Sequence, residues 1–287
     1  MDLLTDLQGE FWFTEPHTPN AGLTLKVKKQ LYHRQSEYQL VEMFQTYDFG
    51  IMMTIDKLVM LTERDEAAYH EMIVHVPALM HPAPKTALVV GGGDGGTLRE
   101  LIRHPSIERA VQVEIDEAVV EASRRHFPWA EEVYQNSRVE LIIDDALKYV
   151  KETRDRFDIV VVDSTDPVGP AVKLFEENFY SNVRDCLTEN GLMSCQIGAP
   201  FYHLEHVQET LETIRRVFGN GELYLAHMPG YPSGLWSLGL ASKQLPLDTP
   251  PDLQRLKAMI GDLRYYNEDL HSGAFALPQY VRKQVKL

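Results

Sequence analysis

The sequence has little cysteine and no long apolar run. Its two cysteines, Cys186 and Cys195, form no CxxC pair and have no histidine cluster nearby, so they indicate neither a disulfide scaffold nor a zinc site. No apolar stretch approaches the roughly 20 residues that a membrane span needs. The start, MDLLTDLQGEFWF, lacks the basic residues and apolar run of a signal peptide. We therefore expect a cytoplasmic protein with no membrane partner.

Positive charge is also scarce. The 287 residues include 28 Lys+Arg against 42 Asp+Glu, a formal net charge of −14. Nucleic-acid-binding surfaces need clustered lysine and arginine, so no nucleic-acid partner is expected. The histidine spacings HxH and HExxH are absent, and we predict no metal and no prosthetic group.

Alternation of apolar and polar residues predicts a small antiparallel sheet near the start of the chain. Residues 23–61 contain the runs LTLKVKKQLYH, YQLVEMFQTY and GIMMTIDKLVML, which have the period of two that half-buried strands show. The spacing then becomes helical, with Thr62 as the expected N-cap and HPAP at residues 81–84 as the stop. We divide the chain into an N-terminal β-strand domain, residues 1–62, and a larger domain, residues 63–287.

The larger domain alternates short apolar runs with helical patterns. The runs TALVVG, RAVQVEI, VELII, FDIVVVD, LMSCQI and LWSLGLAS indicate buried strands, and LEHVQETLETIRRVF indicates one of the helices. Strand–helix alternation predicts a parallel, doubly wound sheet with helices on both faces. The predicted fold class is therefore α/β, a doubly wound sheet with a small N-terminal antiparallel β domain.

The first apolar run leads into the glycine-rich stretch GGGDGGTLRE, residues 91–100. Glycine permits positive φ and close backbone approach, and the helix that follows offers N–H groups to a ligand. Gly91, Gly93 and Gly96 satisfy the GxGxxG spacing, so this pattern leaves NAD open beside other nucleotide-like ligands.

Acidic residues follow the carboxyl ends of successive predicted strands. They are Asp94, Glu114, Asp144, Asp145, Asp163 and Asp166. Because parallel strands bind ligands at their carboxyl ends, we expect these residues to surround one crevice. So much negative charge repels the pyrophosphate of NAD and favours a sulfonium cofactor with an ammonium-bearing substrate. Asp163 and Asp166 suit the roles of proton acceptor and anchor for an attacking amine.

Several stretches, in the same order along nearly the whole chain, resemble the polyamine aminopropyltransferases. They include TERDEAAYHEM, GGGDGGTLRE, DSTDPVGP and YPSGLWS. The resemblance implies a Rossmann-like catalytic domain of the S-adenosylmethionine-dependent methyltransferase type. It also implies transfer of the aminopropyl group of decarboxylated S-adenosylmethionine, a co-substrate, to putrescine, which gives spermidine and methylthioadenosine. A homodimer or homotetramer with contacts through the N-terminal sheet is implied as well.

The resemblance also implies roles for individual residues. Asp163 corresponds to the proton acceptor, and Asp94 to the residue that holds the aminopropyl ammonium. The implied donor-binding residues are Gln39, Gly91, Gly93, Asp94, Glu114 for the ribose, and Asp145, Ala146 and Pro170 for the adenine. The implied amine-binding residues are Tyr69, His70, Asp94, Asp163, Asp166, Gln196 and Tyr231. Residues 164–174 resemble a loop that closes over the substrates.

The sequence departs from the family at a few positions. In IDKLVMLT, Lys57 replaces a glycine, Met60 a glutamine and Leu61 a threonine. Other departures are Ala67, Ala68 and Gly230. These changes leave cadaverine, agmatine or a longer polyamine as alternative acceptors. Two other functions stay open: an S-adenosylmethionine methyltransferase, which Asp94 disfavours because the intact cofactor carries a carboxylate, and a non-catalytic polyamine or nucleoside sensor.

Overall fold

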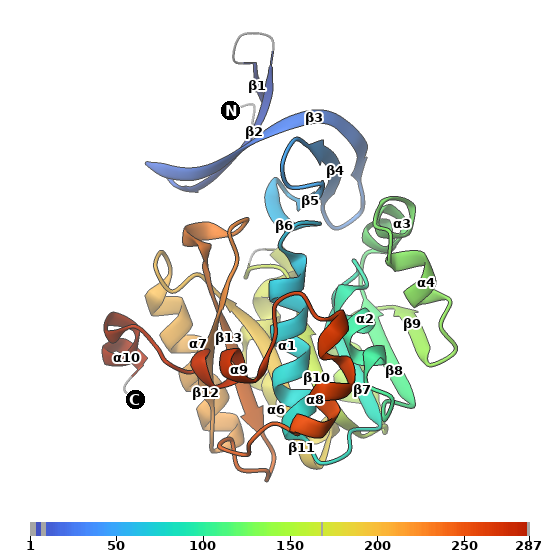
Figure 1. Ribbon diagram of the computed structural model, residues 1–287, viewed down its shortest axis with the longest axis vertical. Coiled ribbons are helices and arrows are strands. Elements are labelled where there is room, and N and C mark those ends of the chain that lie inside the picture. The colour runs from blue at the N-terminus through green and yellow to red at the C-terminus, as the bar shows by residue number, and fades with distance from the viewer. Residues whose placement is uncertain (1–3, 7–9, 168, 286–287) are drawn as a thin grey trace.

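The protein contains two β-sheets, and one long helix connects the first sheet to the second along the chain. The computed structural model describes residues 4–6, 10–167 and 169–285, with side chains for residues 10–167 and 171–285. Figure 1 shows the N-terminal sheet above the larger sheet, with α1 (Glu66–Met80) leading from the first into the second. Within the described residues, no helix has both the length and the apolar character needed to span a membrane.

The N-terminal sheet contains six antiparallel strands in chain order: β1 (Leu4–Asp6), β2 (Phe11–Thr18), β3 (Ala21–Gln35), β4 (Leu40–Thr46), β5 (Ile51–Ile55) and β6 (Leu58–Thr62). The apolar run over residues 50–61 is a hairpin, not one strand. Its turn is formed by Asp56 and Lys57, whose φ angles are 48° and 69°, the positive values that two-residue hairpin turns require. β1 and β2 lie before the region for which the sequence predicted strands.

The larger sheet has seven strands in the order β12-β13-β11-β10-β7-β8-β9. Their bounds are β7 (Thr86–Gly91), β8 (Arg109–Glu114), β9 (Val139–Ile143), β10 (Phe157–Asp163), β11 (Leu187–Gly198), β12 (Glu222–His227) and β13 (Leu235–Ser242). β7 to β11 are parallel, but β13 runs antiparallel to both of its neighbours. The expectation of a wholly parallel sheet was wrong, because residues 228–234 are too few for a crossover and join β12 to β13 as a hairpin. β12 was not predicted.

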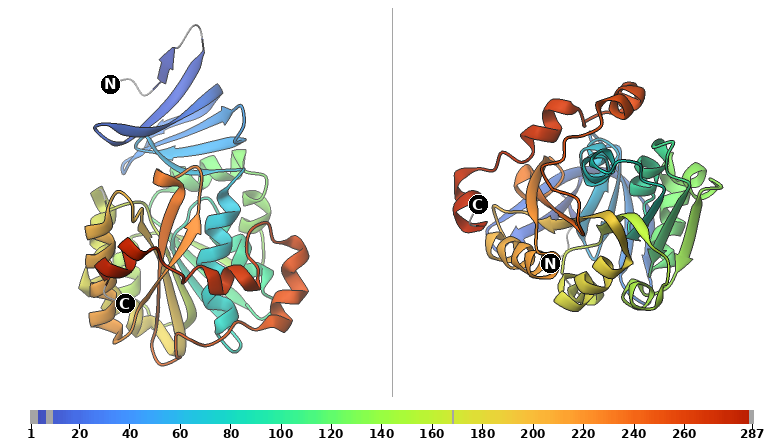
Figure 2. Two further views of the ribbon diagram at one scale, coloured as in Figure 1. Left: turned by 60° about the vertical axis from the view of Figure 1, so that its left-hand side comes forward. Right: turned by 90° about the horizontal axis from the view of Figure 1, so that it is seen from below.

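Helices cover both faces of this sheet, as the doubly wound pattern predicts. Along β7, Ala87 and Val89 pack on one face while Leu88 and Val90 pack on the other, the alternation that strand geometry imposes. The first face carries α1, α2 (Gly96–Arg103) and α8 (Leu253–Met259). The second carries α5 (Ala146–Glu152), α6 (Glu177–Cys186), α7 (Leu204–Phe218) and α10 (Gln279–Val285). Figure 2 shows the two helix layers from other directions.

The N-terminal sheet rests on the larger domain through α3 (Glu117–His126). Ala118, Val119 and Ala122 pack against buried residues of β4, β5 and β6. The remaining short helices are α4 (Ala130–Tyr134), α9 (Glu268–Gly273), and the 3-10 helices η1 (Gly169–Phe175), η2 (Pro232–Gly234) and η3 (Ile260–Asp262). This packing places the sheet above the carboxyl ends of the parallel strands.

The transition from sheet to helix differs slightly from the prediction. Thr62 is the last residue of β6 rather than the N-cap, and its hydroxyl donates to Asp65 Oδ1 at 2.5 Å. The helix begins at Glu66, later than expected, and it ends at Met80, directly before the HPAP stretch that was predicted to stop it. α7 has the bounds of the predicted helix. The division into domains at residues 62 and 63 stays a prediction.

Candidate active site

The point where the chain direction across the sheet reverses lies between β7 and β10. From β7 the chain adds β8 and β9 on one side, and β10 and β11 lie on the other. At the carboxyl end of this strand pair, Asp163 lies opposite Gly91. A cavity of about 460 Å³ opens here, between the strand ends and the N-terminal sheet. Open α/β sheets bind ligands at such a point, so we place the candidate active site in this cavity.

The glycine loop brings its backbone against Asp163. The N–H of Gly92 donates to the carbonyl of Asp163 at 2.8 Å. Gly92 has a φ of 68°, and a Cβ at this position would lie 2.7 Å from Asp163 Oδ2. Any other residue would therefore strain the backbone and displace the carboxylate. The glycine-rich sequence positions Asp163 as well as shaping the cavity.

Asp163 is partly buried and receives two hydroxyl hydrogen bonds. Tyr69 from α1 donates to Oδ1 at 2.7 Å, and Thr97 from α2 donates to Oδ2 at 2.6 Å. Burial, together with the neighbouring charge of Asp94, raises the pKa of Asp163 from 3.8 to about 6. A carboxylate with a pKa in this range can accept a proton near neutral pH.

One end of the cavity suits a nucleoside. Glu114, the last residue of β8, is buried, and Oε1 accepts the Asp116 N–H at 2.9 Å. Burial raises the pKa of Glu114 from 4.5 to about 7. Asp145 caps α5 by accepting the Leu147 N–H at 2.8 Å. The predicted donor-binding residues that line this cavity are Gln39, Gly91, Gly93, Asp94, Glu114, Asp145 and Ala146.

Two of the predicted positions, Asp144 and Pro170, differ from the others. Asp144 does not belong to the acidic crevice, because it lies outside the cavity lining and pairs with Lys148 on the surface of α5 at 3.1 Å. Adjacent residues after a strand point in different directions, so only Asp145 of this pair faces the cavity. Pro170 lies in η1, and its side chain is outside the described residues. Other parts of the predicted loop, residues 164–166 and 171–174, line the cavity.

A smaller cavity of about 40 Å³ continues from the first toward the N-terminal sheet. Seven residues line both cavities: Leu58, Met60, Tyr69, Tyr231 and residues 164–166. Gln196 and Trp236 line only the smaller one, and His70 only the larger. The predicted amine-binding residues are thus distributed over two connected spaces.

Glu15 is the acidic residue of this smaller cavity that the sequence analysis missed. It lies on β2, is 4% exposed, and its Oε2 accepts the Val59 N–H at 2.6 Å. Burial raises the pKa of Glu15 from 4.5 to about 7, and Asp166 adds to this effect. The available signal was its spacing: Phe13 and Glu15 share one face of β2, so a glutamate occupies an otherwise apolar position.

The departures from the family pattern do not all reach the cavities. Met60 lines both, and its backbone carbonyl accepts the Tyr231 hydroxyl. Ala67 and Ala68 are buried in α1 and line neither. Gly230 donates its N–H to Asp65 Oδ2 at 2.6 Å, and a Cβ there would lie 2.8 Å from that oxygen. Of these four positions, Met60 is therefore the one placed to affect a ligand.

His70, Asp94 and Asp163 gather ligand-type atoms within 4.8 Å of one another. His70 Nδ1 lies 2.7 Å from Glu66 Oε2, and Nε2 lies 3.1 Å from Asp94 Oδ1. Both ring nitrogens therefore face carboxylate oxygens. The absence of a metal requirement stays a prediction.

Comparison with known proteins identifies the family. The family described as "Spermine/spermidine synthase domain" matches residues 66–249, and "Spermidine synthase tetramerisation domain" matches residues 11–63. The chain belongs to the spermine/spermidine synthase family. It is an aminopropyltransferase, and decarboxylated S-adenosylmethionine is its co-substrate.

Similar proteins cover nearly the whole chain. A polyamine aminopropyltransferase of Caldicellulosiruptor saccharolyticus is 44% identical over 278 residues, covering 96% of this chain and 99% of that protein. That of Methanocaldococcus jannaschii is 43% identical over 291 residues, covering 100% of this chain and 99% of that protein. The spermidine synthase of Thermotoga maritima superposes with a TM-score of 0.92 at 38% identity, covering 99% and 96%. A spermidine synthase in complex with the transition-state analogue AdoDATO has a TM-score of 0.93 at 38% identity, covering 99% and 97%. The predicted family and fold are confirmed.

Proposed function

We propose that this aminopropyltransferase uses putrescine as its acceptor and produces spermidine and methylthioadenosine. In this reaction the amine nitrogen attacks the carbon next to the sulfonium, and the carbon–sulfur bond breaks. The bonding electrons pass to sulfur, which becomes a neutral thioether. The attacking nitrogen must lose a proton before or during this step, so a base has to lie beside it.

We propose Asp163 as this base. The observation that carries the assignment is its position: Asp163 lies in the lining of the larger cavity, beside Tyr69 and residues 164–166, where the smaller cavity joins it. A donor in the larger space and an amine in the smaller one would therefore meet at this carboxylate. Asp94 is proposed to hold the aminopropyl ammonium. Glu15 and Asp166 are proposed to hold the distant ammonium of the amine.

The remaining predicted residues keep the roles that the family resemblance implied. We propose that Gln39, Glu114, Asp145 and Ala146, with the glycine loop, bind the nucleoside of the donor. Tyr69, His70, Gln196 and Tyr231 are proposed to border the amine. In this proposal Pro170 keeps its implied place near the adenine.

A competition assay tests the acceptor. Decarboxylated S-adenosylmethionine is supplied with equimolar putrescine, cadaverine, agmatine and spermidine, and early products are identified by mass. We expect spermidine as the main product. Another aminopropylated amine would contradict putrescine and direct attention to Met60. Methyl transfer from intact S-adenosylmethionine, or binding without turnover, would contradict the proposed reaction.

Asp163→Asn tests the base. We expect kcat to fall at least about 100-fold, the lower end of what general base catalysis contributes, while methylthioadenosine still binds. Asp144→Asn is the matched control, because Asp144 also follows a parallel strand of this sheet but pairs with Lys148 outside the cavity. Equal rates for the Asp163→Asn variant and the wild type would contradict the assignment.

We also propose a homo-oligomer, a dimer or a tetramer, with contacts through the N-terminal sheet. The match of residues 11–63 to a tetramerisation domain supports this. Sedimentation velocity at micromolar concentration should give a species of at least twice the chain mass of 32.8 kDa, and a monomer alone would contradict it. A cytoplasmic location is likewise proposed, supported by two cysteines that are both free and buried.

A further inference from the structure

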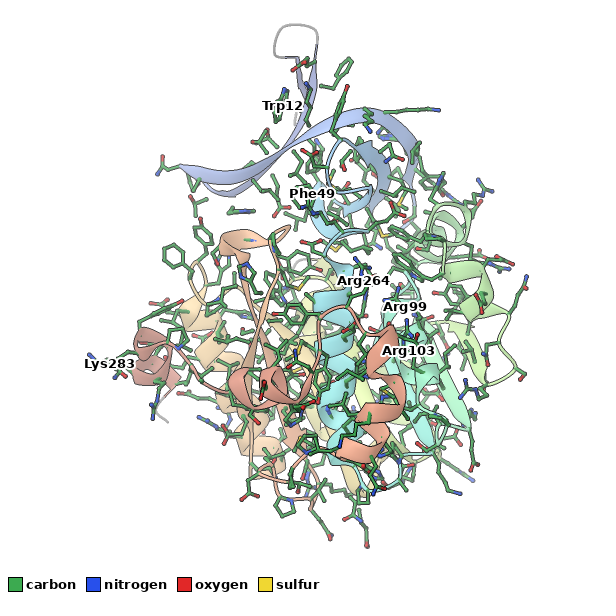
Figure 3. The ribbon with its side chains drawn as sticks, in the orientation of Figure 1. Trp12, Phe49, Arg99, Arg103, Arg264 and Lys283 are labelled. Atoms are coloured by element: carbon green, nitrogen blue, oxygen red, sulfur yellow. The ribbon has the colours of Figure 1, made fainter. Side chains whose placement is uncertain are left out.

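A buried chain of alternating charges leads away from Asp94. His70 bonds to both Asp94 and Glu66, and Glu66 accepts from Arg99 at 2.7 Å and from Arg264 at 3.0 Å. Arg99 also pairs with Glu100 at 2.6 Å. Figure 3 shows Arg99, Arg103 and Arg264 gathered beside α1 and α2. The proposed reaction involves Asp94 but not the charged residues that His70 connects to it.

The His70 side chain is tightly packed and held in one position. Its side chain is 2% exposed, and a Cβ on Gly96 would lie only 2.3 Å from the ring. An ionised carboxylate only accepts hydrogen bonds, so an ionised carboxylate beside each ring nitrogen favours a proton on both nitrogens. Burial opposes this charge, but Asp94 and Glu66 outweigh it and raise the pKa of His70 to about 10. The charged or titratable groups that face His70 are Glu66 and Tyr69 on α1, Asp94 after β7 and Asp163 on β10.

The contacts of one carboxylate oxygen, Oδ1, set the orientation of Asp94. Oδ1 accepts the Gly96 N–H at 2.7 Å and lies 3.1 Å from His70 Nε2, within ion-pair distance. Among the described residues, no side chain or backbone group donates to Oδ2. Asp94 lines the larger cavity, so Oδ2 is the oxygen left for a ligand's ammonium.

Glu66 in turn is held as an anion. Burial acts to raise its pKa, but the bonds from His70 and Arg99 hold the pKa of Glu66 below its ordinary value. Arg264 reaches Glu66 from the C-terminal segment. The backbone N–H of Arg264 donates to Glu71, also on α1, at 2.8 Å. The position of Glu66 is therefore fixed from three separate parts of the fold.

We propose that Glu66 is a positioning residue for aminopropyl transfer. It keeps His70 as an imidazolium, whose second N–H fixes Oδ1 of Asp94 and leaves Oδ2 directed at the donor's ammonium. This inference rests on the proposed role of Asp94 and adds Glu66, which touches no substrate. It also separates two neighbouring carboxylates by their environments: Asp94 bonds to a cation, and Asp163 bonds to two hydroxyls.

The first test needs no variant. Neutron diffraction from perdeuterated crystals of the ligand-free enzyme at pH 8 locates the ring protons. We expect both His70 nitrogens to carry one. A single proton at that pH overturns the proposal, whatever amine the enzyme accepts, so this result is independent of the proposed function.

The second test is Glu66→Gln, which removes one charge and keeps the size. The pH at which His70 loses its proton should fall by about 1 to 3 pH units, the effect of one close opposite charge. Dissociation constants for decarboxylated S-adenosylmethionine and for methylthioadenosine are then measured from pH 7 to pH 9. We expect the preference for the donor to decline about 10-fold toward pH 9, while methylthioadenosine binding stays constant.

Glu100→Gln is the matched control, because Glu100 is equally buried, pairs with Arg99 and Arg103, and does not contact His70. Its donor preference should follow the wild type across this pH range. A constant preference in Glu66→Gln, or one that rises with pH because the imidazolium only repels the donor, overturns the proposal. Should Glu66→Gln not fold, the neutron result decides alone. If the wild type transfers no aminopropyl group, the proposed function fails and not this assignment of protons.

Discussion

The donor end and the amine end of the active site are built in different ways. At the donor end, Gly93, Glu114 and Asp145 lie at the carboxyl ends of the adjacent parallel strands β7, β8 and β9. At the amine end, Glu15, Gln196 and Trp236 come from β2, β11 and β13, far apart in sequence. Strand ends position the first set directly. The second set depends on how the N-terminal sheet packs on the larger domain.

The two ends contain similar acidic residues but are expected to meet different ligand groups. Each end contains a buried glutamate with a pKa raised to about 7, Glu114 at the donor end and Glu15 at the amine end. Ribose hydroxyls can bond to a carboxyl in either protonation state, but an ammonium needs the ionised form. The two ends should therefore respond differently to loss of charge and to pH.

The largest change in ligand affinity is expected at the donor end. Glu114→Gln keeps one acceptor oxygen but loses the charge, and charge-assisted hydrogen bonds are worth about 1.5–3 kcal/mol. Affinity for methylthioadenosine, measured by calorimetry, should fall about 30-fold, with the KM for putrescine nearly unchanged. Glu117→Gln, on the exposed start of α3, is the control. A loss below about threefold would mean that Glu114 does not bind the ribose.

Glu15→Gln should produce the opposite selectivity. The amine pocket loses one of its two carboxylates, so the KM for putrescine should rise about 10-fold, while methylthioadenosine affinity is retained. Glu10→Gln controls for charge, since Glu10 pairs with Lys26 at the edge of the same sheet. If both ligands bind more weakly in Glu15→Gln, the glutamate supports the sheet rather than the amine.

Lower pH distinguishes the ends without any substitution. The pKa of Asp163 is about 6, so kcat/KM for putrescine should fall about 10-fold per pH unit below pH 6. Methylthioadenosine carries no ammonium, so its affinity should change only as Glu114 takes up its proton near pH 7, and it should stay nearly constant below pH 6. A parallel decline in both would show that the protein itself changes at low pH.

The raised pKa values of three buried or partly buried carboxyls determine how the stability of the folded protein changes with pH. The pKa values of Glu15, Glu114 and Asp163 are raised in the folded state, from 4.5, 4.5 and 3.8 to about 7, 7 and 6. Their contribution is fully present below the ordinary values and is lost as pH rises through 6 to 7. The ligand-free enzyme is thus destabilised by these groups at neutral pH, and a cationic substrate offsets that charge.

How much the sequence could predict follows the same division. Glu114, Asp145 and Asp163 were placed correctly in one cavity because strand ends are visible in the apolar pattern. Asp144 could not be distinguished from Asp145, since the direction of each side chain after the strand depends on the start of α5. Glu15 was missed because β2 gains its buried face only from packing against the rest of the sheet. The direction of β13 follows from the short hairpin that joins it to β12. Because β12 was not predicted, the length of this connection was not recognised in the sequence.

The smallest effect is expected outside the site, at the turn between β5 and β6. Lys57 is exposed and has a φ of 69°, a left-handed conformation that costs an L-residue about 1–2 kcal/mol. Lys57→Gly removes that strain but gives up some entropy of the unfolded chain, so we expect a net gain of about 0.5–1 kcal/mol in chemical denaturation. Lys57→Ala keeps the Cβ and should change little. Equal stabilisation by both would assign the effect to the lost charge. Because Lys57 lines neither cavity, kcat/KM for both substrates should stay at the wild-type value in each variant.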